Sequence, residues 1–166
     1  MSIHSSDPFA TPEHLRSPVR RLRGRLPAAV TLWTAPGPAG LTVSSTLVVD
    51  GRPGRLLGVL DEESALWEAT TAHGRFAVTL LEAADRQLAD RFAGAMPAPG
   101  GLFQGDTWQH TDFGPVPTGH ATWAGCTLDG SRPLGWGLLV EATITHIEVG
   151  DGEPLVHHRG RYRQLG

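Results

Sequence analysis

The chain has 166 residues and a formal net charge of −3, with 40% hydrophobic and 19% charged residues. That length suits one domain with a sizeable core, and the composition is typical of globular rather than disordered proteins. The net charge provides no basic field for binding nucleic acid or an anionic membrane surface. Every cation is an arginine, and the absence of lysine excludes Schiff-base lysine chemistry and the P-loop lysine.

The cysteine count, the positions of the histidines and the hydropathy of the sequence exclude further classes of protein. Cys126 is the only cysteine, so there is no internal disulfide, and its strand-like neighbours predict a buried side chain. His157 and His158 are adjacent but would point to opposite faces of a strand, so we expect no metal site. No apolar stretch resembles a secretory signal or approaches the roughly 20 residues of a membrane span. We therefore expect a soluble, cytoplasmic protein.

The first 26 residues divide into two segments. Residues 1–14 are polar and contain two prolines, which predicts a mobile tail. Residues 15–26 carry five arginines and no acid, and their apolar residues recur at helical spacing (Leu15, Val19, Leu22, Leu26). This pattern predicts an amphipathic helix packed on the domain with its arginines in solvent. A dimer contact or the steering of phosphates by the arginines remains an alternative.

From Pro27 onward, short β-like runs alternate with turns. The expected strands are residues 28–34, 41–49, 56–60, 76–81, 121–128, 137–149 and 155–158. Within 137–149 the apolar residues change parity, from Leu138, Val140, Ala142 and Ile144 to Ile147 and Val149. A β-bulge produces such a change, and bulges bend strands around barrel corners.

Two helices are expected between the strands. One begins at residues 61–64, where an N-cap candidate and acids complement the helix dipole, and runs to about His73 before Gly74. The other spans about residues 84–93 and ends at Gly94. Short strands with few helices predict a mainly β, α+β barrel domain over residues 15–166.

The common catalytic signatures are absent from the sequence, including G-x-G-x-x-G, the P-loop, H-E-x-x-H and G-x-S-x-G. Residues 40–46 (GLTVSST) stand out because hydroxyl side chains are concentrated within an apolar strand. Small neutral donors of this kind suit a phosphate or a carbonyl-rich ring system. The alternative is the solvent-facing side of an ordinary polar strand.

Six segments, taken in order, resemble the flavin reductase-like family of FMN-binding split-barrel proteins. They are residues 29–34 (AVTLWT), 40–45 (GLTVSS), 74–81 (GRFAVTLL), 88–94 (LADRFAG), the strand around 125–126, and 154–156 leading to 160–165. The resemblance implies a six-stranded split β-barrel with a few short helices that forms a homodimer. It also implies FMN or FAD bound near the dimer interface, with NADH or NADPH as the co-substrate.

The resemblance further implies which residues bind the flavin. The T-x-S-S segment and its neighbours would contact the isoalloxazine and the ribityl phosphate (Thr42, Val43, Ser44, Ser45, Thr46). Ser64 would lie near the phosphate, where a helix N-terminus favours anions. Phe92, Ala93 and Gly94 would flank the pocket, and Tyr162 would lie close to it. No catalytic residue is assigned.

Three segments depart from the family pattern. Residues 48–54 (VVDGRPG) replace S-V-S-x-x-P-P. Three carboxylates at residues 61–63 stand where relatives often have a basic residue near the phosphate helix, so Arg52, Arg55, Arg91 or a partner chain's arginine must offset them. Finally, Trp136 stands within Gly-Trp-Gly where relatives have G-D-H.

These observations leave three hypotheses for function. A reductase would transfer a hydride from NADH or NADPH to flavin N5 and supply reduced flavin to a partner monooxygenase. Trp136 and the acidic helix start favour the alternative of a flavin-binding carrier or sensor without NAD(P)H activity. A split-barrel enzyme that uses heme or pyridoxal phosphate is a third hypothesis, disfavoured by the absence of lysine and of a clear axial histidine.

Overall fold

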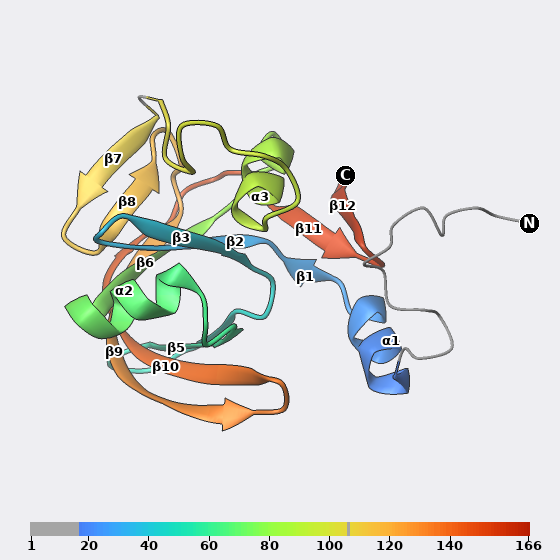
Figure 1. Ribbon diagram of the computed structural model, residues 1–166, viewed down its shortest axis with the longest axis horizontal. Coiled ribbons are helices and arrows are strands. Elements are labelled where there is room, and N and C mark those ends of the chain that lie inside the picture. Colours follow the sequence, from blue (N-terminus) through green and yellow to red (C-terminus); the bar gives the residue numbers. More distant parts are fainter. Residues whose placement is uncertain (1–16, 106) are drawn as a thin grey trace, which may run out of the picture.

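The computed structural model describes residues 17–105 and 107–166. Its elements in chain order are α1 (Pro18–Arg25), β1 (Ala28–Ala29), β2 (Thr31–Ala35), β3 (Ala39–Val43), β4 (Leu47–Val49), β5 (Arg55–Leu60), α2 (Ala65–His73), β6 (Arg75–Leu80), α3 (Arg86–Phe92), β7 (Trp108–Thr111), β8 (Gly114–Pro117), β9 (Trp123–Leu134), β10 (Gly137–Glu148), β11 (Leu155–His158) and β12 (Arg161–Gln164) (Figure 1). The expected tail, residues 1–14, lies outside the described residues. The domain start at residue 15 therefore stays a prediction.

Seven strands form the main sheet, which curves into a barrel in the antiparallel order β3-β2-β6-β9-β10-β5-β4 (Figure 1). β3 and β4 follow each other in the chain but lie at opposite edges of this sheet, so the barrel is split between them. The expected mainly β split barrel is confirmed, with one strand more in this sheet than the six expected. β1, β11 and β12 form a second sheet, and β7 and β8 form a separate hairpin.

The parity change in the longest strand corresponds to an irregularity in pairing. In the β9–β10 ladder, Ile144 pairs with Cys126 and His146 with Gly125, which leaves Thr145 as an extra residue. A second shift lies between Glu141 and Ala142. The predicted bulge is confirmed, and it bends the strand around the barrel as such bulges do.

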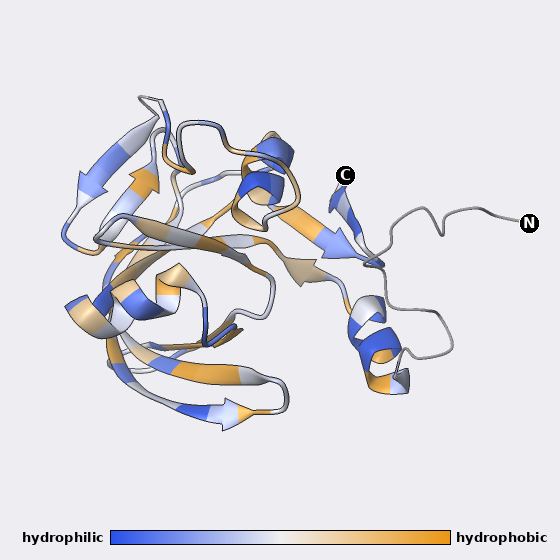
Figure 2. Cartoon of the chain, in the orientation of Figure 1, coloured by the Kyte–Doolittle hydropathy of each residue, from blue (hydrophilic) through white to orange (hydrophobic). Residues whose placement is uncertain are grey.

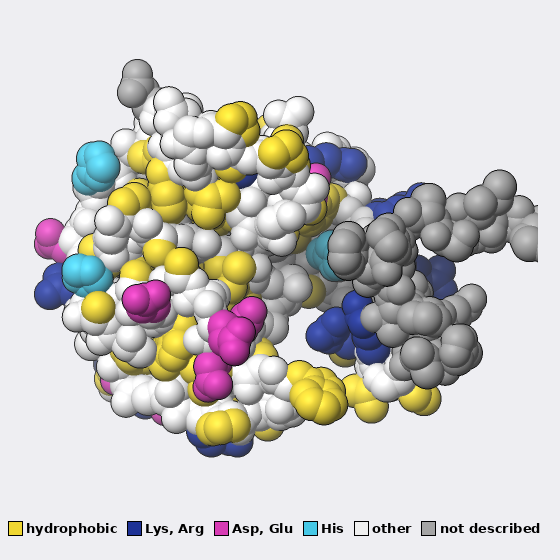
Figure 3. Space-filling model, in the orientation of Figure 1, with side chains coloured by type: hydrophobic (Ala, Val, Ile, Leu, Met, Phe, Trp, Pro, Cys, Tyr) yellow, Lys and Arg dark blue, Asp and Glu magenta, His cyan; other side chains and the backbone are white. Residues whose placement is uncertain are grey.

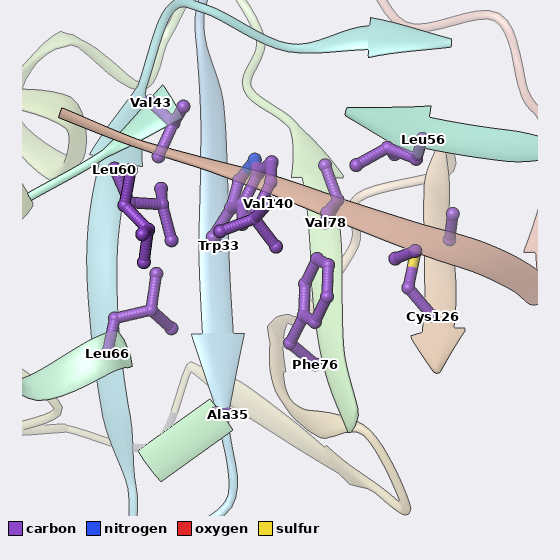
Figure 4. Close-up of a cluster of buried hydrophobic side chains, with 13 residues drawn as sticks. Trp33, Ala35, Val43, Leu56, Leu60, Leu66, Phe76, Val78, Cys126 and Val140 are labelled. Atoms are coloured by element: carbon purple, nitrogen blue, oxygen red, sulfur yellow. The ribbon is translucent and has the colours of Figure 1, made fainter. Parts of the chain in front are cut away.

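The main core fills the barrel interior and is centred on Trp33 and Phe76 (Figure 4). Their rings stack with centroids 4.7 Å apart. Gly58 lies directly against the Trp33 ring, because a Cβ at that position would come within 2.4 Å of it. Cys126 is fully buried, as expected, and burial raises the pKa of its thiol to about 12, so it acts as a packed apolar group.

Two expected strands are interrupted, each for a physical reason. The run 28–34 breaks at Val30, whose N–H donates to Leu155 and whose carbonyl accepts from Leu81, so this residue joins the two sheets. The run 41–49 breaks at residues 44–46, where the chain crosses from one edge of the split to the other. Side-chain hydrogen bonds from this crossing replace the ladder there.

The helices differ in how well they follow expectation. α2 ends with Gly74 as its C-cap in the left-handed region, as predicted, and its N-cap is Ser64. The acids at residues 61–63 precede this cap, so they do not lie in the first helical turn as expected; the acid there is Glu68. α1 forms but has no buried residue, and Val19 and Leu22 are 74% and 63% exposed. The expected packing of α1 on the barrel is therefore wrong for the described chain, since it projects beside the barrel (Figures 1 and 2). None of the described helices is both long and apolar enough to span a bilayer.

Candidate functional site

A groove of about 940 Å³ opens where the barrel is split. One wall consists of residues 41–45, at the end of β3, together with residues 59–61, at the end of β5. The other wall consists of α1 and the turn between β11 and β12. Figure 3 shows this hollow between the barrel and α1, with basic side chains on the α1 side and acidic ones on the barrel side. The volume is near the upper end of the range for ligand pockets.

Four of the predicted binding residues line this groove, namely Thr42, Val43, Ser44 and Ser45. Two of their hydroxyls are already engaged. That of Thr42 donates to the Ala89 carbonyl at 2.7 Å, and that of Ser45 accepts from the Val59 N–H and donates to the Val59 carbonyl, both at 3.0 Å. The Ser44 hydroxyl makes no hydrogen bond within the described residues, so it is free to bond a ligand.

Thr46, also predicted as a contact, points into the barrel interior instead. Its hydroxyl lies 2.8 Å from that of Thr31 and accepts from Trp33 Nε1 at 3.0 Å. Thr31 in turn donates to the Val43 carbonyl at 2.7 Å. This network fixes the loop at residues 44–46, so Thr46 positions the groove wall without lining it.

The remaining predicted residues do not line this groove. Ser64 caps α2 by accepting the Trp67 N–H at 3.2 Å. Phe92 is buried against Phe103 and Trp108, and Ala93 and Gly94 follow it at the end of α3.

Tyr162 packs against a second core cluster, separate from the main core, whose buried members include Phe92, Leu32, Leu81 and Leu155. Burial raises the pKa of the Tyr162 phenol to about 12, with a further contribution from Asp90. Phe92 and Tyr162 therefore support the groove from behind.

Arginines of α1 form the opposite wall, together with one arginine of the β11–β12 turn (Arg20, Arg21, Arg23, Arg159). Within residues 17–105 and 107–166, none of the four has a carboxylate within salt-bridge distance. From the sequence, a phosphate-steering role of the α1 arginines is one alternative to a solvent-exposed helix face, and Arg159 is not among the predicted site residues. The turn expected at Arg159-Gly160, close to the only tyrosine of the sequence, is the signal that could have identified Arg159.

The arginines that were expected to offset the acidic helix start do not line the groove. Arg55 is paired with Asp129 at 2.9 Å and Glu141 at 2.7 Å. Arg91 has its guanidinium 5.6 Å from the centroid of the Phe92 ring. Arg52 is exposed in the loop between β4 and β5. The basic groups of the site therefore come from α1 and the β11–β12 turn.

Asp61 is the carboxylate that lines the groove on the barrel side. Its Oδ1 accepts the Glu63 N–H at 2.9 Å, and its carbonyl accepts the Ser64 N–H at 3.1 Å. Together with the Ser64 cap, these bonds occupy N–H groups at the start of α2. The N–H groups of Ala65 and Leu66, at the start of the helix itself, make none of these bonds within the described residues. The Asp61 carboxylate beside them still disfavours an anion there.

Trp136, at the tip of the β9–β10 hairpin, is fully exposed in the described chain. No described residue packs over its ring. The indole of this Gly-Trp-Gly segment is thus presented outward from the barrel and does not fill a cavity in it.

Comparison with known proteins places these features in a family. Residues 23–166 match the flavin reductase like domain. The FMN reductase (NADH) RutF 2 of Methylorubrum extorquens (strain PA1) is 32% identical, over 97% of this chain and 94% of that protein. The NADH:FAD oxidoreductase SgcE6 of Streptomyces globisporus C-1027 superposes with a TM-score of 0.80 at 25% identity, covering 89% of this chain and 91% of that one. A nitrilotriacetate monooxygenase component B homologue from Mycobacterium thermoresistibile superposes with a TM-score of 0.79 at 26% identity, covering 89% and 85%.

Proposed function

The chain belongs to the flavin reductase-like family, and from that premise we propose that it is an oxidoreductase that transfers a hydride from NADH or NADPH to FMN or FAD. The observation that carries this proposal is the groove at the split of the barrel. One wall offers Ser44 and the backbone of residues 41–45, and the other offers arginines. These are suitable partners for a carbonyl-rich ring and for phosphate, respectively.

The donor set of the groove fits a flavin. A bound flavin supplies the electron-accepting ring on which the hydride is received. The chain's own contribution is to hold that ring against the β3 wall, whose position is fixed by the bonds of Thr42 and Ser45. Hydride transfer needs alignment of donor and acceptor rings and exclusion of water, and it requires no dedicated acid or base. The scarcity of titratable groups on the groove's barrel wall, where Asp61 is the one carboxylate among the described residues, agrees with this chemistry.

We further propose that the reduced flavin is released to a partner monooxygenase. The M. thermoresistibile relative is named as a monooxygenase component, which supports this proposal for the present chain. The groove lies at the surface of the described chain, between the barrel and a helix with no buried residue, which suits repeated exchange of flavin. Retention of one flavin through many turnovers would argue against release.

We also propose that the protein forms a homodimer. β4 is an edge strand, and its three residues Leu47, Val48 and Val49 are all exposed. Val19 and Leu22 of α1 are exposed as well. Apolar side chains in such number on one molecule are typical of a protein–protein interface. A second copy that covers them would also narrow the groove.

The test is the visible spectrum of the purified protein with added FMN or FAD under anaerobic conditions, before and after NADH or NADPH. We expect bleaching of the flavin band well above a protein-free control. A perturbed flavin spectrum that survives both nucleotides would instead favour the carrier or sensor and would implicate Trp136. If neither flavin's spectrum is perturbed or bleached, the proposed function is wrong.

A further inference from the structure

We propose that Arg20, Arg21 and Arg23 of α1, together with Arg159, form a diphosphate site that recognises the pyrophosphate of a dinucleotide in this groove. The inference rests on the proposed function and deepens it by naming the part of the ligand that the second wall binds. FAD and the nicotinamide dinucleotides both contain a pyrophosphate. The binding experiment distinguishes these two ligands.

The first observation is the charge distribution around the groove. Four guanidinium groups line one wall and a single carboxylate, Asp61, lines the other. Arg55, which does not line the groove, is paired with two carboxylates, whereas the groove arginines have no carboxylate partner among the described residues. Guanidinium groups bind phosphate oxygens through parallel charge-assisted hydrogen bonds. This wall is therefore suited to an anion.

The second observation is the backbone of Arg159, the one residue other than glycine with positive φ in the described chain, at 55°. It occupies a two-residue turn between His158 and Arg161, with Gly160 at φ 77°. A turn with positive φ at both central residues favours Asn-Gly, Asp-Gly or Gly-Gly. A positive φ is unfavourable for arginine, and residues held in unfavourable backbone conformations concentrate at functional sites. The side chain, rather than the turn, explains why arginine is here.

The two elements that carry the groove arginines, α1 and the β11–β12 turn, are joined by a hydrogen bond. The Arg159 N–H donates to the Gly24 carbonyl of α1 at 2.9 Å. This bond attaches α1, which has no buried residue, to the β11–β12 turn. It joins the backbone of the turn to that of the helix, and the arginines of both elements border the same groove.

The spread of these arginines favours two linked phosphates over one. Arg20 and Arg23 are three residues apart, which separates their Cα atoms by about 4.5 Å along the helix axis. Arg159 adds a third attachment from a different element. Donors distributed over a helical turn and a β-turn can bind neighbouring phosphates at the same time. At the start of α2, by contrast, the Asp61 carboxylate lies beside the helix N-terminus, where its negative charge disfavours a phosphate.

The experiment measures the affinities of riboflavin, FMN and FAD, which carry zero, one and two phosphates. The proteins compared are the wild type, Arg23→Gln and Arg159→Gly, with Arg25→Gln as the matched control. Arg25 lies on the same helix but does not line the groove. Arg159→Gly also relieves the positive φ, so its melting temperature should equal or exceed that of the wild type. A loss of affinity in this variant would then not be a loss of folding.

If the pyrophosphate is that of FAD, Arg23→Gln and Arg159→Gly weaken FAD binding by about tenfold or more, the effect of losing a charge-assisted pair. Riboflavin affinity and the control variant are unchanged. If the pyrophosphate is that of the nicotinamide nucleotide, the flavin series is unchanged and the dissociation constant of NADH rises instead. Either result supports the diphosphate site and identifies its source.

Unchanged affinities for FAD, FMN and NADH in both variants would overturn the diphosphate site. Riboflavin reduction by NADH tests the proposed function separately, because riboflavin has no phosphate for these arginines to bind. A wild type that reduces riboflavin while the variants match it in every affinity would refute this inference alone. A wild type that binds no flavin would refute the proposed function as well.

Discussion

A single hydroxyl, that of Thr46, connects the loop at the groove to the barrel interior. It accepts from Trp33 Nε1 at 3.0 Å and lies 2.8 Å from the Thr31 hydroxyl. We expect Thr46→Val, which preserves shape, to lower the free energy of unfolding by about 1–2 kcal/mol, because a buried network loses one member. Flavin affinity should fall too, since the loop carries Ser44 and Ser45. Urea unfolding and flavin titration measure both effects.

The control for this prediction is Thr71→Val. Among the described residues, the exposed Thr71 hydroxyl bonds only the Glu68 carbonyl of its own helix. Its replacement should change stability by less than about 0.5 kcal/mol. Equal effects of the two substitutions would contradict a special role for Thr46.

His120 and Asp85 form a largely buried pair whose stability depends on pH. His120 Nε2 and Asp85 Oδ2 are 2.6 Å apart, with side-chain exposures of 11% and 15%. The hydrogen bond to Asp85 raises the pKa of His120, outweighing the opposing effect of burial, and Glu82 acts in the same direction as Asp85. Burial works to raise the pKa of Asp85, but its bonds to His120 and the Glu82 N–H leave that pKa lowered.

The direction of these shifts fixes the pH window. His120 stabilises the fold fully below its ordinary pKa of 6.5, and this contribution is lost as pH rises through its raised folded-state pKa. Asp85 contributes above its ordinary 3.8, and this is lost as pH falls through its lowered value. We expect the wild type to lose about 1 kcal/mol or more between pH 6 and 9 relative to His120→Gln. Parallel stability curves for the two proteins in urea unfolding would contradict the assignment.

At the scale of elements, α3 holds β3 in position behind the groove. Thr42 bonds the Ala89 carbonyl of α3, and a Cβ at Gly40 would come within 2.7 Å of the Phe92 ring. Gly40→Ala should therefore cost about 1–3 kcal/mol, as overpacked core positions do. It should also weaken flavin binding, because β3 must shift. Thermal unfolding and titration with FMN measure these effects.

Gly130→Ala in β9 is the matched control, since nothing lies within 4 Å of a Cβ built there. We expect this variant to be as stable as the wild type and to bind flavin equally well. If Gly40→Ala behaved like the control, α3 could not be what positions the β3 wall.

Elements with a strong local pattern could be predicted from the sequence. α2 has a serine cap and a glycine stop, and the apolar parity change located the bulge at Thr145. Residues 41–49 instead read as one strand, because hydroxyl side chains fit a strand as well as a crossing. Their division depends on the partners Val59 and Thr31, which lie in other strands.

The candidate site was predictable only in part, for a similar reason. Its β3 wall follows from a contiguous motif, Thr42 to Ser45. The arginine wall combines α1 with a turn more than 130 residues later in the chain, so only the fold brings these groups together. Side chains such as Phe92 and Tyr162 belong to the motifs but support the groove from the second core cluster.

At the scale of the whole molecule, the split that creates the groove also leaves β4 as an exposed edge. An apolar edge strand with unpaired backbone groups promotes association unless another chain covers it. Val48 is 60% exposed and lies on the strand that directly follows the loop at residues 44–46. In the proposed dimer, this surface would link assembly to ligand binding.

We expect the protein to be a dimer in solution, with a mass about twice the 17.7 kDa of the chain. Val48→Asp places a charge on this edge and should shift the protein toward monomer and weaken flavin binding, because a second copy no longer narrows the groove. Met96→Asp, on the exposed loop after α3, is the control and should stay dimeric. Light scattering after gel filtration gives the mass, and flavin titration of the same samples gives the affinity. A monomeric wild type, or a Val48→Asp dimer with unchanged flavin affinity, would contradict the prediction that dimerisation through β4 supports flavin binding in the groove.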